Sequence, residues 1–179
     1  MNKPNIEIYA DGADVNEMIE ADKLGFVDGF TTNPTLMAKA GINDYLAFAR
    51  SVTSEIKSKP ISFEVFSDDI NEMYDQAQIL KGLGNNIFVK IPVTNTKQEN
   101  TYELIEKLSH EGVSLNVTAI FTKSHIDNVY NVLNKNVPAI ISIFAGRIAN
   151  TGIDPEPTME YAVNLAKSSE KIKILWASS

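Results

Sequence analysis

Ile87-Phe88-Val89-Lys90-Ile91-Pro92-Val93 is apolar on both sides of a single lysine, and this run gives the clearest indication of the fold. A short apolar run without polar alternation is typical of a strand that is buried on both faces, as in a parallel sheet. Lysine is rarely buried without a partner or a purpose, so Lys90 is also a candidate functional residue.

Six other apolar runs along the chain have the same character. They are Ile6–Ala10, Gly29–Thr32, Ile61–Phe66, Ser114–Thr118, Ala139–Phe144 and Ile172–Ala177. Amphipathic segments separate them, and this alternation predicts right-handed βαβ units and a parallel sheet. Because the repeat is regular and has no glycine-rich phosphate loop, we expect an α/β fold of the (β/α)₈ TIM-barrel type. It would be one domain over residues 1–179, with only seven strands visible in the chain.

The segments between the strands carry helix start and stop signals. Asp14 and Glu17 are typical of a capping box, and Asp154 before Pro155 is typical of an N-cap followed by proline in the first turn. The expected helices run from Asp14 toward Gly25, from Asp44 (capped by Asn43) to about Lys57, from Asp68 or Asp69 to about Gly82, from Thr96 to Gly112, from Thr122 or Ser124 to about Asn134, and from Pro155 to about Ser168.

The composition excludes several classes of function. The net charge of −7 argues against nucleic acid or an anionic membrane surface as the main partner. The absence of cysteine excludes disulfides and thiolate chemistry. No apolar run reaches the roughly 18 residues of a membrane span, and the N-terminus has no signal region, so we expect a cytoplasmic protein. His110 and His125 have no metal-ligand spacing, and we expect no metal site.

Polar residues mark the carboxyl ends of the expected strands, which is where a barrel of this type has its active site. They are Asp11, Thr31, Thr32, Asn33, Glu64, Lys90, Asn116, Thr118, Ser142 and Arg147. Each of them ends, interrupts or follows an apolar run that would otherwise belong to the core.

Lys90, Glu64 and Asp11 carry the candidate chemistry. Desolvation disfavours an ammonium ion, so a buried lysine can supply a neutral amine that attacks a ketone and forms an iminium. A structural ion pair is the alternative role of Lys90. Glu64 is the candidate acid–base group for dehydration of the carbinolamine, or it only neutralises Lys90. Asp11 is a candidate base for C–C cleavage, or it forms a turn or helix cap.

The other polar residues are candidates for substrate binding. Asn33 precedes a proline, so its amide either binds a substrate hydroxyl or makes a turn. Asn116, Thr118 and Ser142 either bind hydroxyls and a catalytic water or fill the barrel interior. Arg147 either binds a phosphate through two hydrogen bonds or makes a surface salt bridge.

Seven stretches stand out together, in order, over almost the whole chain. They are Tyr9-Ala10-Asp11, Phe30-Thr31-Thr32-Asn33-Pro34-Thr35, Glu64, Val89-Lys90-Ile91-Pro92-Val93-Thr94, Leu115-Asn116-Val117-Thr118-Ala119-Ile120-Phe121, Ile141-Ser142-Ile143-Phe144-Ala145-Gly146-Arg147-Ile148 and Leu175-Trp176-Ala177-Ser178. Together they resemble the transaldolase family, particularly its compact branch that includes fructose-6-phosphate aldolase.

The resemblance implies a class I aldolase barrel that moves a dihydroxyacetone unit from a ketose phosphate to an aldose phosphate, in the pentose phosphate pathway. It implies no metal or organic cofactor. By position, the resemblance gives Lys90 as the Schiff-base lysine, Glu64 as the acid–base carboxylate, Thr118 as the partner of the catalytic water and Asp11 as the cleavage base. The substrate-binding set that it implies consists of Thr32, Asn33, Asn116, Ser142, Phe144 and the phosphate ligand Arg147.

The chain departs from the family pattern after Ser179. A second phosphate-binding arginine, a helix, an eighth strand and a last helix follow at this point in the family. We therefore expect a seven-stranded sheet with two unpaired edges, either completed by another chain or left open. The expected partners are sugar phosphates and further copies of the chain, as a homo-oligomer.

Two rival functions remain open. The first is a fructose-6-phosphate aldolase that uses free dihydroxyacetone. By the resemblance, such aldolases carry glutamine at the position of Glu64 and tyrosine at the position of Phe144, which favours transaldolase. The second is an inactive barrel fragment that acts as an assembly subunit, which the buried charged residues disfavour because they are costly to desolvate.

Overall fold

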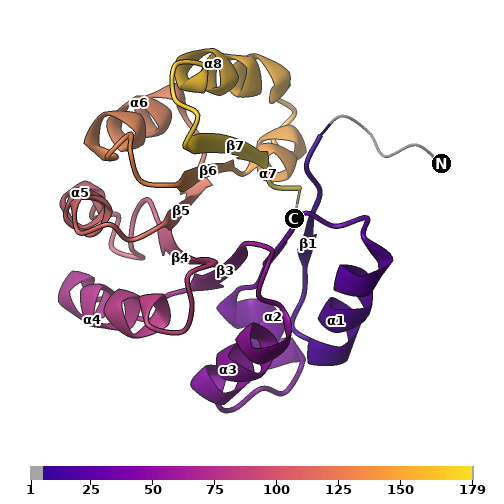
Figure 1. The fold of residues 1–179 in the computed structure, drawn as a ribbon. Coiled ribbons are helices and arrows are strands. Elements are labelled where there is room, and N and C mark those ends of the chain that lie inside the picture. The colour runs from indigo at the N-terminus through magenta and orange to yellow at the C-terminus, as the bar shows by residue number, and fades with distance from the viewer. Residues whose placement is uncertain (1–5, 179) are drawn as a thin grey trace.

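The computed structural model describes residues 6–178, which form one parallel sheet of seven strands in the order β1 to β7. The strands are β1 (Tyr9–Asp11), β2 (Gly29–Thr31), β3 (Ile61–Glu64), β4 (Ile87–Pro92), β5 (Leu115–Ile120), β6 (Ala139–Ile143) and β7 (Ile172–Trp176). The sheet curls until its two outer strands face each other (Figure 1). The expected α/β barrel type with seven strands is confirmed.

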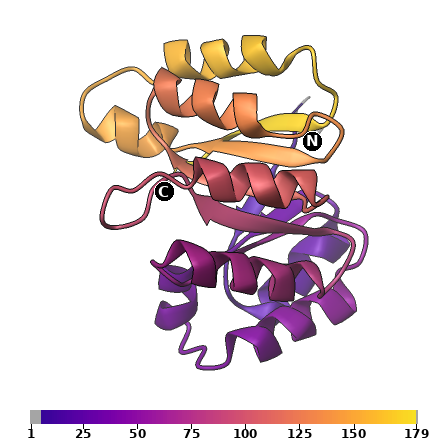
Figure 2. The same cartoon turned by 90° about the vertical axis from the view of Figure 1, so that its left-hand side faces the viewer.

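Helices cover the outer face of the curled sheet, and the side view shows them packed next to one another along it (Figures 1 and 2). They are α1 (Val15–Leu24), α2 (Pro34–Lys39), α3 (Tyr45–Glu55), α4 (Ile70–Lys81), α5 (Tyr102–His110), α6 (Lys123–Val132), α7 (Ala145–Asn150) and α8 (Glu156–Ala166). The two short helices, α2 and α7, follow the ends of β2 and β6 and were not expected from the sequence.

Side-chain caps determine where several helices begin. The Asp14 carboxylate accepts hydrogen bonds from the first-turn amides of α1, and Gly25 ends that helix with a φ of 73°, as glycine permits. Asp44, rather than Asn43, caps α3, because its carboxylate accepts from the Ala47 amide at 2.9 Å.

The expected start of α5 at Thr96 is wrong, since the helix begins at Tyr102. Thr94 and Asn100 form an isolated antiparallel bridge that closes a loop. Within this loop the Thr96 amide and hydroxyl both donate to Asp68, at 2.7 and 2.6 Å, which ties the loop to the segment before α4. These bonds satisfy the backbone amide and the hydroxyl of Thr96 outside a helix, in keeping with the tendency of threonine to form hydrogen bonds that compete with helical structure.

The core lies between the sheet and its helices, and it is densest around the central strands. Phe30, Phe63, Ile91, Leu115 and Ile141 are all fully buried there. Because successive side chains of a strand point to opposite faces, the intervening residues point into the curl of the sheet instead. That alternation places the polar residues of β3 to β6 on the inside.

β5 contains a bulge beside the inner face. Val117 is in register with Ile141 and Ile120 with Ile143, so β5 has one residue more than β6 over this span. Ala119 has a φ of 59°, a left-handed conformation that a residue with a side chain rarely adopts. A bulge re-aims neighbouring side chains, and this one lies directly after Thr118.

The two outer strands pair on one side only. No pairing between β1 and β7 exists within residues 6–178, as expected for a seven-stranded sheet. Between them, the Lys173 ammonium contacts both oxygens of the Glu7 carboxylate, at 2.5 and 2.7 Å. In the part of the chain that the structure describes, no helix has the length and apolar character needed to cross a membrane.

Candidate active site

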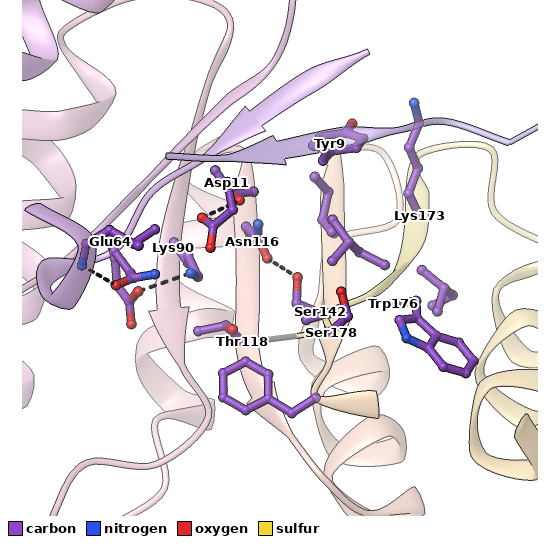
Figure 3. A pocket seen from close by; sticks show the side chains of 18 of the residues that line it. Tyr9, Asp11, Glu64, Lys90, Asn116, Thr118, Ser142, Lys173, Trp176 and Ser178 are labelled. Carbon is purple, nitrogen blue, oxygen red and sulfur yellow. Dashed lines mark hydrogen bonds and ion pairs between the residues drawn. The ribbon is translucent and has the colours of Figure 1, made fainter. Parts of the chain in front are cut away.

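A cavity of about 1260 Å³ lies inside the curl and reaches the carboxyl ends of all seven strands (Figure 3). Its polar lining includes most of the residues expected from the sequence. Those present are Asp11, Asn33, Glu64, Lys90, Asn116, Thr118, Ser142 and Arg147, together with the aromatic Phe144. Polar groups thus converge from β1 and from β3 to β6 upon one space.

Lys90 and Glu64 form the central pair of the cavity. They are register partners on β4 and β3, and the Lys90 Nζ lies 3.1 Å from the Glu64 Oε2. Their side chains are only 11% and 17% exposed, so water screens the pair weakly. The Lys90 Nζ also donates to the Thr32 carbonyl oxygen at 3.4 Å. The Lys90 amine is therefore inside the cavity and next to the Glu64 carboxyl group.

Burial raises the pKa of the Glu64 carboxyl above its ordinary value, while Lys90 opposes the shift and Asp11 adds a smaller upward contribution. Tyr45 fixes the backbone of Glu64, because its hydroxyl donates to the Glu64 carbonyl oxygen at 2.7 Å. The Tyr45 ring also packs edge-on against Phe63 and Phe66, on either side of Glu64. The backbone at Glu64 is thus held in place, and burial shifts the carboxyl toward its protonated form.

Asp11 ends β1 and is more exposed than the central pair. The Thr31 hydroxyl donates to its carboxylate at 2.9 Å, across the register pair of β1 and β2. Asp14, not Asp11, caps α1, which leaves the Asp11 carboxylate in the cavity.

Thr32 differs from its expected placement. Its side chain is fully buried, and Thr31 lines the cavity in its place, because adjacent residues of a strand face opposite sides. Thr32 contributes its carbonyl oxygen to Lys90 instead of its hydroxyl to the cavity.

Asn116 is the middle of a buried hydrogen-bond chain. The Ser142 hydroxyl donates to the Asn116 Oδ1 at 2.7 Å, and the Asn116 Nδ2 donates to the Ser62 hydroxyl at 2.9 Å. Asn116 and Ser62 are fully buried, and Ser142 is nearly so. Figure 3 shows the Asn116 amide beside Lys90, with Ser142 on its other side.

Thr118 follows Asn116 on the same face of β5 and lies next to the bulge. It lines the cavity, and its buried hydroxyl has no hydrogen-bond partner among the described residues. Buried hydroxyls are normally hydrogen-bonded, so this group is suited to a water or a ligand in the cavity.

Asn33 and Arg147 lie at the rim. The Asn33 side-chain Oδ1 accepts from the Leu36 amide at 2.9 Å and caps α2, which is the turn role weighed from the sequence, while the residue still lines the cavity. Arg147 is exposed on α7, with its guanidinium 5.6 Å from the centre of the Phe144 ring. Gly146 allows this placement, since a Cβ there would lie 2.6 Å from the Ser178 carbonyl oxygen.

Ser62 and Tyr45 were missed by the sequence analysis. Ser62 lies two residues before Glu64, on the same face of β3, and that alternation was the available signal. Tyr45 gave no signal, because its contact with Glu64 is a tertiary one between α3 and β3. Among residues 6–178 no cluster of three or more histidine, aspartate or glutamate side chains is arranged to hold a metal ion.

Comparison with known proteins identifies the family. The family model described as transaldolase/fructose-6-phosphate aldolase matches residues 8–179. A probable transaldolase of Sulfurihydrogenibium sp. is 37% identical over 153 residues, which is 83% of this chain and 66% of that protein. A probable transaldolase of Dehalococcoides mccartyi is 36% identical over 149 residues, or 83% of this chain and 65% of that protein. The chain thus spans about two thirds of the length of these relatives.

The fold has a counterpart among solved structures. Dihydrodipicolinate synthase from Rhodopseudomonas palustris superposes with a TM-score of 0.50 at 13% identity, over 98% of this chain and 64% of that one. At this identity the likeness concerns the fold alone. The family model, in contrast, matches the sequence along nearly the whole chain. This match shows that the protein belongs to the transaldolase/fructose-6-phosphate aldolase family.

Proposed function

We propose that the protein is a transaldolase that moves a dihydroxyacetone unit from a ketose phosphate to an aldose phosphate through a Schiff base on Lys90. The observation that carries the proposal is the 3.1 Å contact between the Lys90 amine and Glu64 inside a large cavity into which hydroxyl, amide and charged side chains converge. A structural ion pair would not require the convergent hydroxyls and amides around it.

The first half of the reaction builds the iminium. The Lys90 nitrogen attacks the ketone carbon, and the resulting carbinolamine loses its hydroxyl as water when Glu64 donates a proton. The raised pKa of Glu64 favours the protonated form that this step needs. Glu64 is then a carboxylate and can later activate the water that hydrolyses the iminium, with the Thr118 hydroxyl binding that water.

The second half breaks and remakes a carbon–carbon bond. Asp11 takes the proton of the substrate hydroxyl beside the scissile bond, the aldose leaves as an aldehyde, and the bonding electrons move into the iminium to give an enamine. The enamine carbon attacks the aldehyde of the acceptor, and Asp11 returns the proton. Asn33, Asn116 and Ser142 bind the hydroxyls of the transferred unit, and Arg147 binds the phosphate.

The other activity in the family's description is aldolase chemistry with free dihydroxyacetone. Glu64 and Phe144 favour transfer over release, because the resemblance associates glutamine and tyrosine at these positions with free dihydroxyacetone. The proposal also includes self-association through the outer edges of β1 and β7, which do not pair with each other within residues 6–178.

The test is to follow fructose 6-phosphate consumption with and without an aldose phosphate acceptor. We expect consumption that depends on the acceptor and no accumulation of dihydroxyacetone. Free dihydroxyacetone released at the same rate without an acceptor would replace the proposal by the aldolase activity, and no consumption in either condition would refute both activities.

A further inference from the structure

Ser62 is a polar residue on the inner face of β3 that lies outside the lining of the cavity. It is fully buried and is not among the residues that line the cavity, so a substrate there has no access to its hydroxyl. Its Oγ nevertheless accepts a hydrogen bond of 2.9 Å from the Asn116 amide, which does line the cavity. Any effect of Ser62 on the reaction must therefore pass through Asn116.

The Asn116 amide is held at both ends. Its oxygen accepts from Ser142 on β6 and its nitrogen donates to Ser62 on β3, so the bonds span β4 and connect three strands. An asparagine amide has two N–H groups, and one of them is taken by Ser62. The plane of the amide, and with it the direction of the second N–H, is thereby fixed.

Water cannot replace the Ser62 hydroxyl easily, because Ser62 and Asn116 are both fully buried. Without this hydroxyl, the amide N–H must remain unsatisfied or turn toward the cavity. Either result moves the group that the proposed function assigns to a substrate hydroxyl. Sites of this kind need their groups within about 0.5 Å of the productive position.

The geometry points to Ser62 as a positioning residue that orients Asn116 for the ketose, an inference that rests on the proposed function. The hydroxyl acts on binding of the transferred unit and not on proton transfer, because within residues 6–178 its hydrogen bond goes to Asn116, whereas Lys90 contacts Glu64 and the Thr32 carbonyl oxygen. Loss of the Ser62 hydroxyl should therefore change the half-saturating substrate concentration more than it changes the maximal rate.

The experiment compares Ser62→Ala and Ser62→Cys with wild type. Cysteine keeps nearly the shape of serine but is a weak hydrogen-bond acceptor, so it separates the bond from the packing. The readout is borohydride trapping of fructose 6-phosphate on the enzyme at increasing concentrations. We expect the half-saturating concentration to rise about three- to tenfold in both variants, as for the loss of one hydrogen bond, with less than a twofold change in the maximal trapping rate.

Ser109→Ala is the matched control. Ser109 on α5 is also buried, and its hydroxyl also accepts a hydrogen bond of 2.9 Å, from the backbone amide of Asn134. Neither Ser109 nor Asn134 lines the cavity. We expect Ser109→Ala and Ser62→Ala to lower the thermal midpoint by similar amounts. Only Ser62→Ala should raise the half-saturating concentration, which excludes a general loss of stability as the cause.

A double mutant supplies the decisive comparison. If Ser62 acts through Asn116, then adding Ser62→Ala to Asn116→Ala will change the half-saturating concentration by less than twofold. An additive effect in the double mutant, a wild-type value in Ser62→Cys, or an equal effect of Ser109→Ala would each overturn the inference while leaving the proposed function intact. Absence of trapping in the wild-type enzyme would overturn both.

Discussion

The centre and the edges of the sheet differ in how far they shield a charged side chain from water. β3 to β6 have neighbours on both sides and are mostly buried, whereas within residues 6–178 β1 and β7 pair on one side and are largely half-buried or exposed. Lys90 and Glu64 lie in the centre, and Asp11 lies at the β1 edge. Glu64, whose pKa burial raises, thus occurs where the sheet itself excludes water, while the β1 edge supplies an exposed carboxylate.

The largest expected effect comes from replacing the central amine. Lys90→Arg keeps the charge beside Glu64 but removes the nucleophile, because a guanidinium stays protonated and cannot form the iminium. We expect transfer activity to fall by about 10⁴-fold or more, as for loss of a covalent nucleophile. The measurement is the rate of acceptor-dependent consumption of fructose 6-phosphate, and activity within tenfold of wild type would remove Lys90 from the mechanism.

Glu64→Gln should have the second-largest effect, a loss of about 10²–10⁴-fold in the rate of iminium formation. The pH dependence has a definite sign. Because burial raises the pKa of Glu64, its protonated form persists above the usual range, and the dehydration step is lost as the pH rises through that raised pKa. Trapping rates measured across pH should show this alkaline decline in wild type and not in Glu64→Gln. An identical profile in the two enzymes would contradict the assignment.

Asp11→Asn tests the edge against the centre. We expect transfer to fall by about 10²-fold, since a proton acceptor is lost. Trapping of the iminium should persist, because that step uses only the central pair. If trapping disappears together with transfer, the division of roles between edge and centre is incorrect.

The same contrast applies to stability. Ile141 on β6 is fully buried, so Ile141→Ala should lower the free energy of unfolding by about 2–5 kcal/mol. Ile174 on β7 is only partly buried, and Ile174→Ala should cost less than about 2 kcal/mol. Urea unfolding measures both values, and an equal loss in the two variants would show that β7 is as tightly packed as the centre.

The smallest effect concerns the ion pair between the two edges. Both Lys173 and Glu7 are about half exposed, and such a pair is worth about 0–1 kcal/mol. Lys173→Gln should therefore change the free energy of unfolding by less than about 1 kcal/mol, and less still at high salt. A loss above 2 kcal/mol would show that this contact is essential to keeping the edges together.

The sequence was most informative at the centre of the sheet, for a physical reason. Strands buried on both faces are continuous apolar runs, so the lysine of β4 and the glutamate of β3 interrupt a clear pattern. The sequence was less informative about where helices begin. Thr96 resembles a helix start, but its backbone amide donates a hydrogen bond to Asp68, which is distant along the chain. The sequence also does not determine which of Thr31 and Thr32 faces the cavity, because a shift of one residue along a strand exchanges the inner face of the sheet for the outer face.

Ser62 and Tyr45 mark what a single sequence cannot supply. Their importance lies in hydrogen bonds to Asn116 and to the Glu64 backbone, between elements that are far apart along the chain. Periodicity predicts the face on which a side chain lies, but it does not predict the partner across that face.

The central claim is that Lys90 forms the covalent intermediate, and one measurement tests it most directly. The wild-type enzyme is reduced with borohydride in the presence of fructose 6-phosphate, digested, and its peptides are mapped by mass spectrometry. We predict one added three-carbon unit on Lys90, with the exposed lysines such as Lys173 unmodified. A stable adduct on another lysine with Lys90 untouched would contradict it.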